Sequence, residues 1–303
     1  MADVTHEDRG QLILITGFAL AVVLLTLVLL LNSAIFVEHT ATQRPSADAA
    51  APIEFRDGTI TATERTIGAV NEPPGTNEST AMATFDTLAN RTYDRYARKG
   101  AIANVSYEVT AGTVIEKTNT SANTQNGSPS GPANWTVLDN ASETRAYTHT
   151  FTRLNETTDP VGNATAIVVN GRTLYVSVEG TSGSVRDLTS GDTVLVTEEG
   201  GDTCSIELVD HNTVTFDITA AELRSSNARC SIETVSAGDS IQDVAITRGD
   251  LSNGSYTLVT RGGTTESGTQ REGVYSVIVS MRYVGESVTV DTAERVAPGE
   301  PHA

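Results

Sequence analysis

Lysine is almost absent from this 303-residue chain, and positive charge as a whole is scarce. Only two of the 20 basic residues are lysines, Lys99 and Lys117, whereas Asp and Glu together number 38 and the formal net charge is −18. A protein that binds nucleic acid needs a basic surface to neutralise phosphates. This charge balance therefore argues against a nucleic-acid partner.

Sequence motifs of catalysis are also lacking. No histidine takes part in H-E-x-x-H or another metal-ligand spacing, and the chain has no G-x-S-x-G, P-loop or dinucleotide-binding glycine motif. We therefore predict a non-enzymatic protein with no catalytic residue, no metal site and no cofactor. The alternative is an enzyme whose site assembles only in three dimensions. The five scattered histidines are His6, His39, His149, His211 and His302.

The surplus of carboxylates has a second implication. An acidic chain that is poor in Lys and rich in Thr looks like a protein from a salt-loving archaeon. Hydrated carboxylates repel one another across such a surface, and concentrated salt screens that repulsion at short range. The alternative is an ordinary acidic exported protein.

Cysteine occurs only twice, at Cys204 and Cys230, without a C-x-x-C motif. Cys204, Ile206 and Leu208 share one face of a predicted strand. If this part of the chain is outside the cell, a disulfide between the two cysteines is expected, worth about 3 kcal/mol for a loop of this size. The alternative is two unrelated buried thiols.

A charge-free run of 26 residues, Leu12 to Val37, stands near the start of the chain. As a helix it would extend about 39 Å, more than the roughly 30 Å of a bilayer core. It is too long for a cleaved secretory peptide, whose exit site would also differ. We predict a cytoplasmic leader at 1–10 and a transmembrane or assembly helix at 11–38.

The remainder predicts an α+β fold with a β-rich, sandwich-like antiparallel extracellular head. A stalk or linker is expected at 39–78, the β-rich ectodomain at 79–295 and a flexible tail at 296–303. One amphipathic helix is expected from Ser79 to Lys99, and beyond it strands with alternating apolar residues. Asn170-Gly171 between two β-branched runs predicts a hairpin. The predicted apolar stripe of the helix comprises Met82, Phe85, Ala89, Tyr93 and Tyr96.

Asparagine is placed unusually often at N-glycosylation sequons, and ten of 16 asparagines begin N-x-[ST]. This density predicts an exported, glycosylated surface. The alternative is turn chemistry in an exposed region without sugar. The ten are Asn77, Asn90, Asn104, Asn119, Asn126, Asn134, Asn140, Asn155, Asn163 and Asn253.

The join Arg9-Gly10-Gln11, followed at once by the apolar run, resembles the class III signal peptide of archaeal type IV pilins and archaellins. The stretch "RGQLILITGFALAVVLLTLVLLLNSAIFVE" also looks like the start of pilin-like membrane proteins of haloarchaea. The resemblance covers about 30 residues and implies that a prepilin peptidase cuts between Gly10 and Gln11. The mature helix would then pack with copies of itself. Ile15 stands where bacterial pilins commonly carry a buried glutamate.

These features together predict a non-enzymatic, pilin-like cell-surface protein, a minor or accessory type IV pilus subunit in surface assembly or adhesion. Its expected partners are the membrane, the prepilin peptidase and other pilin-like subunits. Its expected location is the cell membrane, with a single span and the ectodomain outside, or a surface filament. The alternative is an uncleaved single-pass anchor that carries an extracellular binding module.

Overall fold

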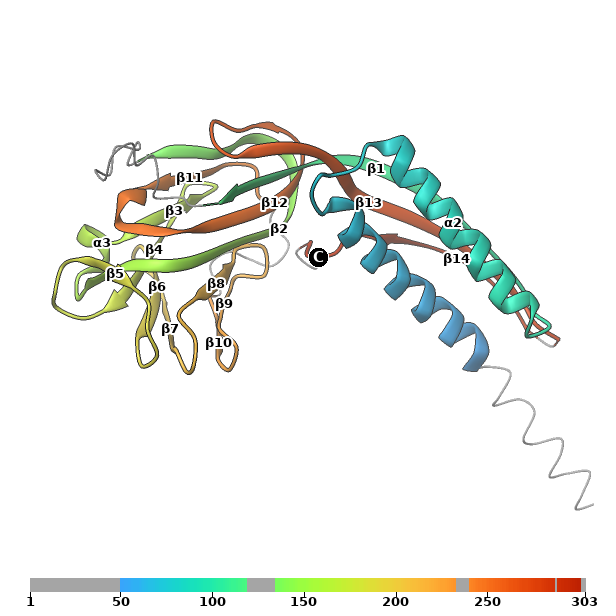
Figure 1. Cartoon of the computed structure of the whole chain (residues 1–303), viewed down its shortest axis with the longest axis horizontal. Helices are drawn as coiled ribbons and strands as arrows, with labels where there is room; N and C mark the ends of the chain where they lie inside the picture. The colour runs from blue at the N-terminus through green and yellow to red at the C-terminus, as the bar shows by residue number, and fades with distance from the viewer. Residues whose placement is uncertain (1–49, 119–133, 233–239, 287, 301–303) are drawn as a thin grey trace, which may run out of the picture.

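The computed structural model describes residues 50–118, 134–232, 240–286 and 288–300. It is mostly β, with 52% of residues in strands and 21% in helices, so the predicted α+β class is wrong. Two helices lie at one end, short strands form a lobe at the other, and long strands run between them (Figure 1). Most of the described chain thus belongs to one extended β structure.

The predicted membrane-spanning helix finds no support in this structure. No helix among the described residues is both long and apolar enough to cross a membrane. The segments predicted as the leader (1–10) and the transmembrane helix (11–38) lie outside the described residues.

Long antiparallel strands form the backbone of the molecule. Hydrogen bonds join them in the order β14-β13-β1-β12-β2. Their pairings connect segments far apart in the chain, such as Val105 of β1 opposite Met281 of β13. The bounds are β1 (Ile102–Thr118), β2 (Trp135–Thr157), β12 (Ser252–Thr264), β13 (Thr269–Val284) and β14 (Thr289–Val296).

The predicted sandwich-like arrangement is also wrong, because one hydrogen-bonded sheet takes in all 14 strands of the described residues. β2 is 23 residues long and pairs with β12, β11, β8 and β5, and with β4 in parallel. Asn140 and Ala146 of β2 have positive φ angles of 54° and 53°, and the β2–β12 register shifts near them. Such irregularities bend a strand. A long, bent β2 lets one sheet curl over its own core instead of stacking on a second.

Shorter strands build the lobe around β2. The predicted hairpin is confirmed: Val169 pairs with Arg172, and Asn170 and Gly171 both have positive φ, as a two-residue type I′ turn requires. The remaining bounds are α3 (Pro160–Asn163), β3 (Thr165–Val169), β4 (Arg172–Glu179), β5 (Val185–Asp187), β6 (Thr193–Glu198), β7 (Thr203–Glu207), β8 (Val214–Asp217), β9 (Glu222–Arg224), β10 (Arg229–Ser231), β11 (Val244–Thr247) and η1 (Gly249–Leu251).

The predicted amphipathic helix is present as α2 (Glu78–Ala97). Its cap is Asn77, whose side chain accepts a hydrogen bond from the Thr80 amide. The chain leaves the helix through Gly100, which has a φ of +80°. The predicted stripe is only partly right, because Tyr93 is 53% exposed while Phe85 and Tyr96 are buried.

A helix at 50–71 occupies much of the predicted stalk or linker, which corrects that prediction. Its buried stripe holds two threonines, Thr59 and Thr63, between Phe55 and Ile67. Each threonine hydroxyl donates to the carbonyl four residues earlier, at 2.7 and 2.8 Å. Such bonds satisfy the hydroxyls and permit their burial. The helical period is hidden in the sequence because these two buried positions are polar.

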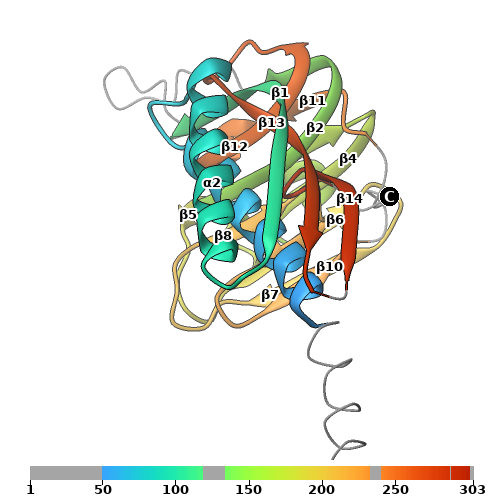
Figure 2. The same cartoon turned by 90° about the vertical axis from the view of Figure 1, so that its right-hand side faces the viewer.

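Two hydrophobic cores divide the molecule. The larger lies within the β lobe and includes Phe151, Leu174 and Phe216. The smaller lies where helix 50–71 and α2 cover one face of β1 and β13, including Phe85 and Met281. Figure 2, turned so that this end faces the viewer, shows both helices beside β1, β13 and β14. The smaller core is therefore a helix-on-sheet module.

Candidate functional site

Helix 50–71 is the element that connects most directly to the predicted assembly segment, because it is the first described element after the charge-free run 12–37. Its first turns are held by aromatic contacts. The ring of Phe55 lies 5.1 Å from that of Tyr96 on α2 and 5.6 Å from that of Tyr283 on β13. Such pairs add to the free energy gained by burial. One residue thus joins both helices to the sheet.

The far end of the helix is locked to β13 by Asn71. The side-chain NH₂ of Asn71 donates to the Val274 carbonyl at 2.9 Å, and its side-chain oxygen accepts from the Val274 N–H at 2.7 Å. Arg271 donates to the Asn71 carbonyl through Nε and Nη2 at 3.2 and 3.0 Å. A Cβ on Gly273 would come 2.7 Å from the Asn71 side-chain oxygen, so glycine makes room for this contact. Both ends of the helix are therefore fixed.

An Asn71→Leu variant is expected to lose about 2–3 kcal/mol of the free energy of unfolding, because the Val274 N–H loses its partner in a half-buried site. Chemical denaturation measures this loss. Arg56→Gln is the control, since its bond to Glu294 at 2.6 Å is exposed and should contribute less than about 1 kcal/mol. Equal losses in the two variants would contradict the proposed anchor.

The structure separates the predicted sequons by exposure. Asn155 is 3% exposed and donates to the Asn163 carbonyl at 2.6 Å, so a sugar there is incompatible with this fold. Asn253 is half-buried. Asn119 and Asn126, like Gly10 and Gln11, lie outside the described residues. The exposed sequon asparagines are Asn77, Asn90, Asn104, Asn134, Asn140 and Asn163.

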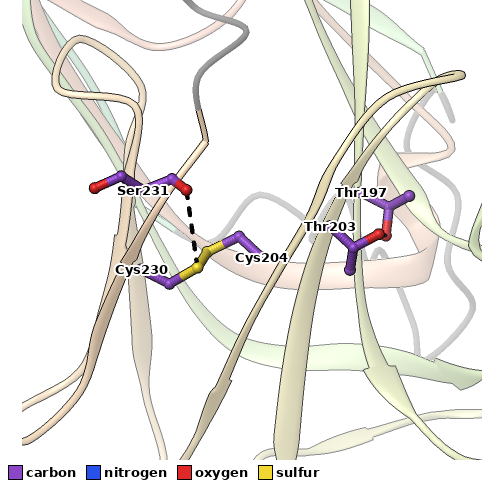
Figure 3. Close-up of a disulfide and its surroundings, with 5 residues drawn as sticks. All are labelled: Thr197, Thr203, Cys204, Cys230 and Ser231. Atoms are coloured by element: carbon purple, nitrogen blue, oxygen red, sulfur yellow. Dashed lines mark hydrogen bonds between the residues drawn. A yellow bond between two sulfur atoms is a disulfide. The ribbon is translucent and has the colours of Figure 1, made fainter.

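The two cysteines meet at the far side of the β lobe. Cys204 on β7 and Cys230 on β10 form a disulfide with their Cα atoms 5.8 Å apart (Figure 3). Nearby, the Thr203 hydroxyl donates to that of Thr197 across the β6–β7 hairpin at 3.3 Å. The disulfide ties this hairpin to the β8–β10 strands.

One pocket, of about 650 Å³, lies between the Pro73-Pro74 turn, the end of β1 and the start of β13. Lys117 borders it, and burial lowers the pKa of this lysine. Its ammonium group lies 5.0 Å from the Trp135 ring centre and donates to the Ser267 hydroxyl. Arg271 is bonded to Glu116 at 2.6 Å. Both cations are already engaged, so the pocket offers no free charge to a ligand.

His149 has the most perturbed environment of the described histidines. It is fully buried and stacked on Phe151 with ring centres 4.1 Å apart, and burial lowers its pKa to about 3. Neither ring nitrogen has a hydrogen-bond partner among the described residues. A neutral imidazole enclosed in the core cannot exchange protons with a substrate. In the part of the chain that the structure describes, no three His, Cys, Asp or Glu side chains gather to hold a metal ion.

Comparison with known proteins places the chain in a family. No curated protein and no solved structure matches it. A family of unknown function, DUF7261, matches residues 6–169, which is more than half of the chain. The matched region includes the apolar run, both long helices and β1 to β3, but not the disulfide. The chain therefore belongs to the family of unknown function DUF7261.

Proposed function

We propose that the protein is a non-enzymatic, pilin-like subunit of the cell surface that assembles through its N-terminal segment. The observation that carries this proposal is the way helix 50–71 is fixed. Phe55 packs at its beginning and Asn71 is bonded at its end, directly after the segment that contains residues 12–37. The start of the described chain is thereby fixed to the β-rich part.

The apolar segment supplies the means of assembly. A charge-free run of 26 residues is strongly driven out of water, and copies of it can bury one another. Its small residues, among them Gly17, Ala19 and Ala21, would let neighbouring helices approach closely. The family match spans this segment together with helix 50–71, α2 and β1.

The rest of the molecule suits display rather than chemistry. Six sequon asparagines are exposed on the described surface. His149 is sealed in the core, and both cations at the Lys117 pocket are occupied by other groups. We therefore favour surface assembly or adhesion, with the prepilin peptidase and other pilin-like subunits as partners, over catalysis.

The N-terminal peptide of the protein purified from surface material tests the proposal. Mass spectrometry is expected to find a mature chain that begins at Gln11. A Gly10→Asp variant should keep its leader and lose surface assembly, whereas the neighbouring Asp8→Asn variant should still be processed. A surface form that retains residues before Gln11 would overturn the proposal and leave a monomeric binding module as the better description.

A further inference from the structure

The end of α2 and the two residues that follow it carry an unusual concentration of positive charge. Four of the chain's 20 basic residues fall between positions 91 and 99, where Asp94 is the one acidic residue. In a chain with a net charge of −18 this is a local reversal of sign. The four are Arg91, Arg95, Arg98 and Lys99.

Most of this charge is not neutralised by carboxylates of the described residues. No carboxylate of the described residues lies within 4 Å of the guanidinium groups of Arg91, Arg95 or Arg98, and Lys99 has only a loose contact of 3.9 Å with Glu54. Several other arginines hold carboxylates, as Arg153 does with Asp187 at 3.1 Å and Arg229 with Glu222 at 3.4 Å, although the exposed Arg65 and Arg282 hold none among the described residues. Three adjacent guanidinium groups therefore remain available to an external anion.

Apolar side chains are exposed at the same end. Ile53 and Ile102 are each 61% exposed and Tyr93 is 53% exposed, and they are the three most exposed of the large apolar side chains described. The contact of Lys99 with Glu54 places the start of helix 50–71 beside the end of α2. Ile102 begins β1, directly after the turn that follows α2. Cations and exposed apolar groups thus occupy one end of the molecule.

A shallow groove of about 230 Å³ runs between the two helices at this end. Arg91 and Arg95, one helical turn apart, border it together with Glu54, and its lining is partly apolar, with Phe55 and Leu88. The two guanidinium groups at its edge can bind anionic headgroups.

We infer that this end of the molecule, hereafter the basic end (Ile53, Arg91, Tyr93, Arg95, Arg98, Lys99 and Ile102), docks on an anionic lipid surface. Guanidinium groups bind lipid phosphates bidentately, and isoleucine and tyrosine side chains enter the boundary between headgroups and acyl chains. The inference rests on the proposed cell-surface location.

Two observations select a lipid surface as the occupant. The charge complements anionic headgroups, while the remaining, strongly acidic surface would be repelled by them, so contact is confined to one end. The chain also enters the described structure at residue 50, at this same end, after a segment that contains 26 charge-free residues. Docking would orient the head with the β lobe pointing away from the lipid (Figure 1).

A fluorescent label at the basic end tests this inference in the full chain. Ala97→Cys is exposed between Arg95 and Arg98, and the native cysteines are paired, so an environment-sensitive dye attaches there alone. With vesicles that contain phosphatidylglycerol, the emission should shift to the blue. With vesicles of phosphatidylcholine alone, the label should remain in water even when flotation shows that the chain has bound.

Charge variants provide the matched comparison. In Arg91→Gln/Arg95→Gln/Arg98→Gln, the fraction of heads docked on phosphatidylglycerol vesicles should fall by about tenfold or more. The control, Arg224→Gln/Arg229→Gln/Arg261→Gln, loses the same charge from exposed sites away from the basic end and should dock normally.

Three results would overturn the inference. The dye emission could stay unshifted with both kinds of vesicle, it could shift equally with both, or it could shift in concentrated protein without vesicles. The last would indicate contact between copies of the chain. Each of these is separable from failure of the proposed function, because that proposal depends on the N-terminal residue of surface material, which this experiment does not measure.

Discussion

A His149→Phe variant is expected to be more stable than the native chain, by a margin that widens as the pH falls from 6.5 towards 3. Below pH 6.5 the unfolded chain binds a proton at His149, whereas the folded chain keeps the ring neutral down to about pH 3. The unfolded state therefore binds more protons in this window, and acid favours unfolding. The difference should grow by about 1.4 kcal/mol for each pH unit.

The variant should already gain about 1–3 kcal/mol at neutral pH. Both ring nitrogens of His149 are buried without a partner among the described residues, and phenylalanine has no polar atoms to desolvate. Its ring is of similar size and can stack on Phe151 as the imidazole does.

Chemical denaturation of the native chain and the His149→Phe variant between pH 7 and pH 4 measures the difference in their free energies of unfolding. Because both chains carry the same carboxylates, the titration of those groups cancels in this difference. The exposed His211 serves as the control, and His211→Gln should not show the gain in stability at neutral pH. A constant difference between native and His149→Phe chains across this range would show that His149 takes up its proton in the folded state.

An Arg145→Met variant is expected to lose about 3 kcal/mol or more of the free energy of unfolding. Arg145 is 3% exposed and donates to the carbonyls of Tyr275 at 2.5 Å, Pro298 at 2.6 Å and Val274 at 2.8 Å. Burial lowers its pKa to about 10, which leaves it charged at neutral pH. Methionine fills similar space but leaves buried carbonyls without this donor.

The same arginine fixes residues predicted to be a flexible tail. The Pro298 carbonyl is bound by Arg145, and the Ala146 N–H donates to the Gly299 carbonyl at 2.7 Å. Hydrogen exchange should therefore show faster exchange at Ala146 in Arg145→Met, alongside the lower stability from denaturation. Arg261→Met is the control, because its pairing with Glu143 is exposed. Similar losses in both variants would refute a special role for Arg145.

Local patterns in the sequence predicted local structure well. Asn170-Gly171 specifies its turn through backbone conformations that these residues tolerate, and the apolar spacing before Gly100 predicts α2. Helix 50–71 was not predicted because Thr59 and Thr63 occupy its buried stripe. Their hydroxyls can be buried because each donates to a backbone carbonyl four residues earlier. A search for apolar periodicity does not count buried polar residues.

Long-range pairing could not be predicted in the same way. β1 and β13 are separated by about 150 residues, and nothing in either strand identifies its partner. The continuous sheet depends on the length and bends of β2, and the alternation of apolar and polar residues in the sequence does not reveal either. The basic end illustrates both cases: its four basic residues and Ile102 are close together in sequence, but only the fold brings Ile53 beside them.

The anchoring of helix 50–71 at both ends has a mechanical consequence. A pull on the chain at residue 50 acts along the helix, which lies on the sheet and is bonded to Val274 at the end opposite the pull. Such a load slides the helix along the sheet and strains the Phe55 packing and the Asn71 bonds together, rather than peeling them away one after another. A surface subunit attached in this way is loaded in shear, the geometry in which many weak contacts share the force.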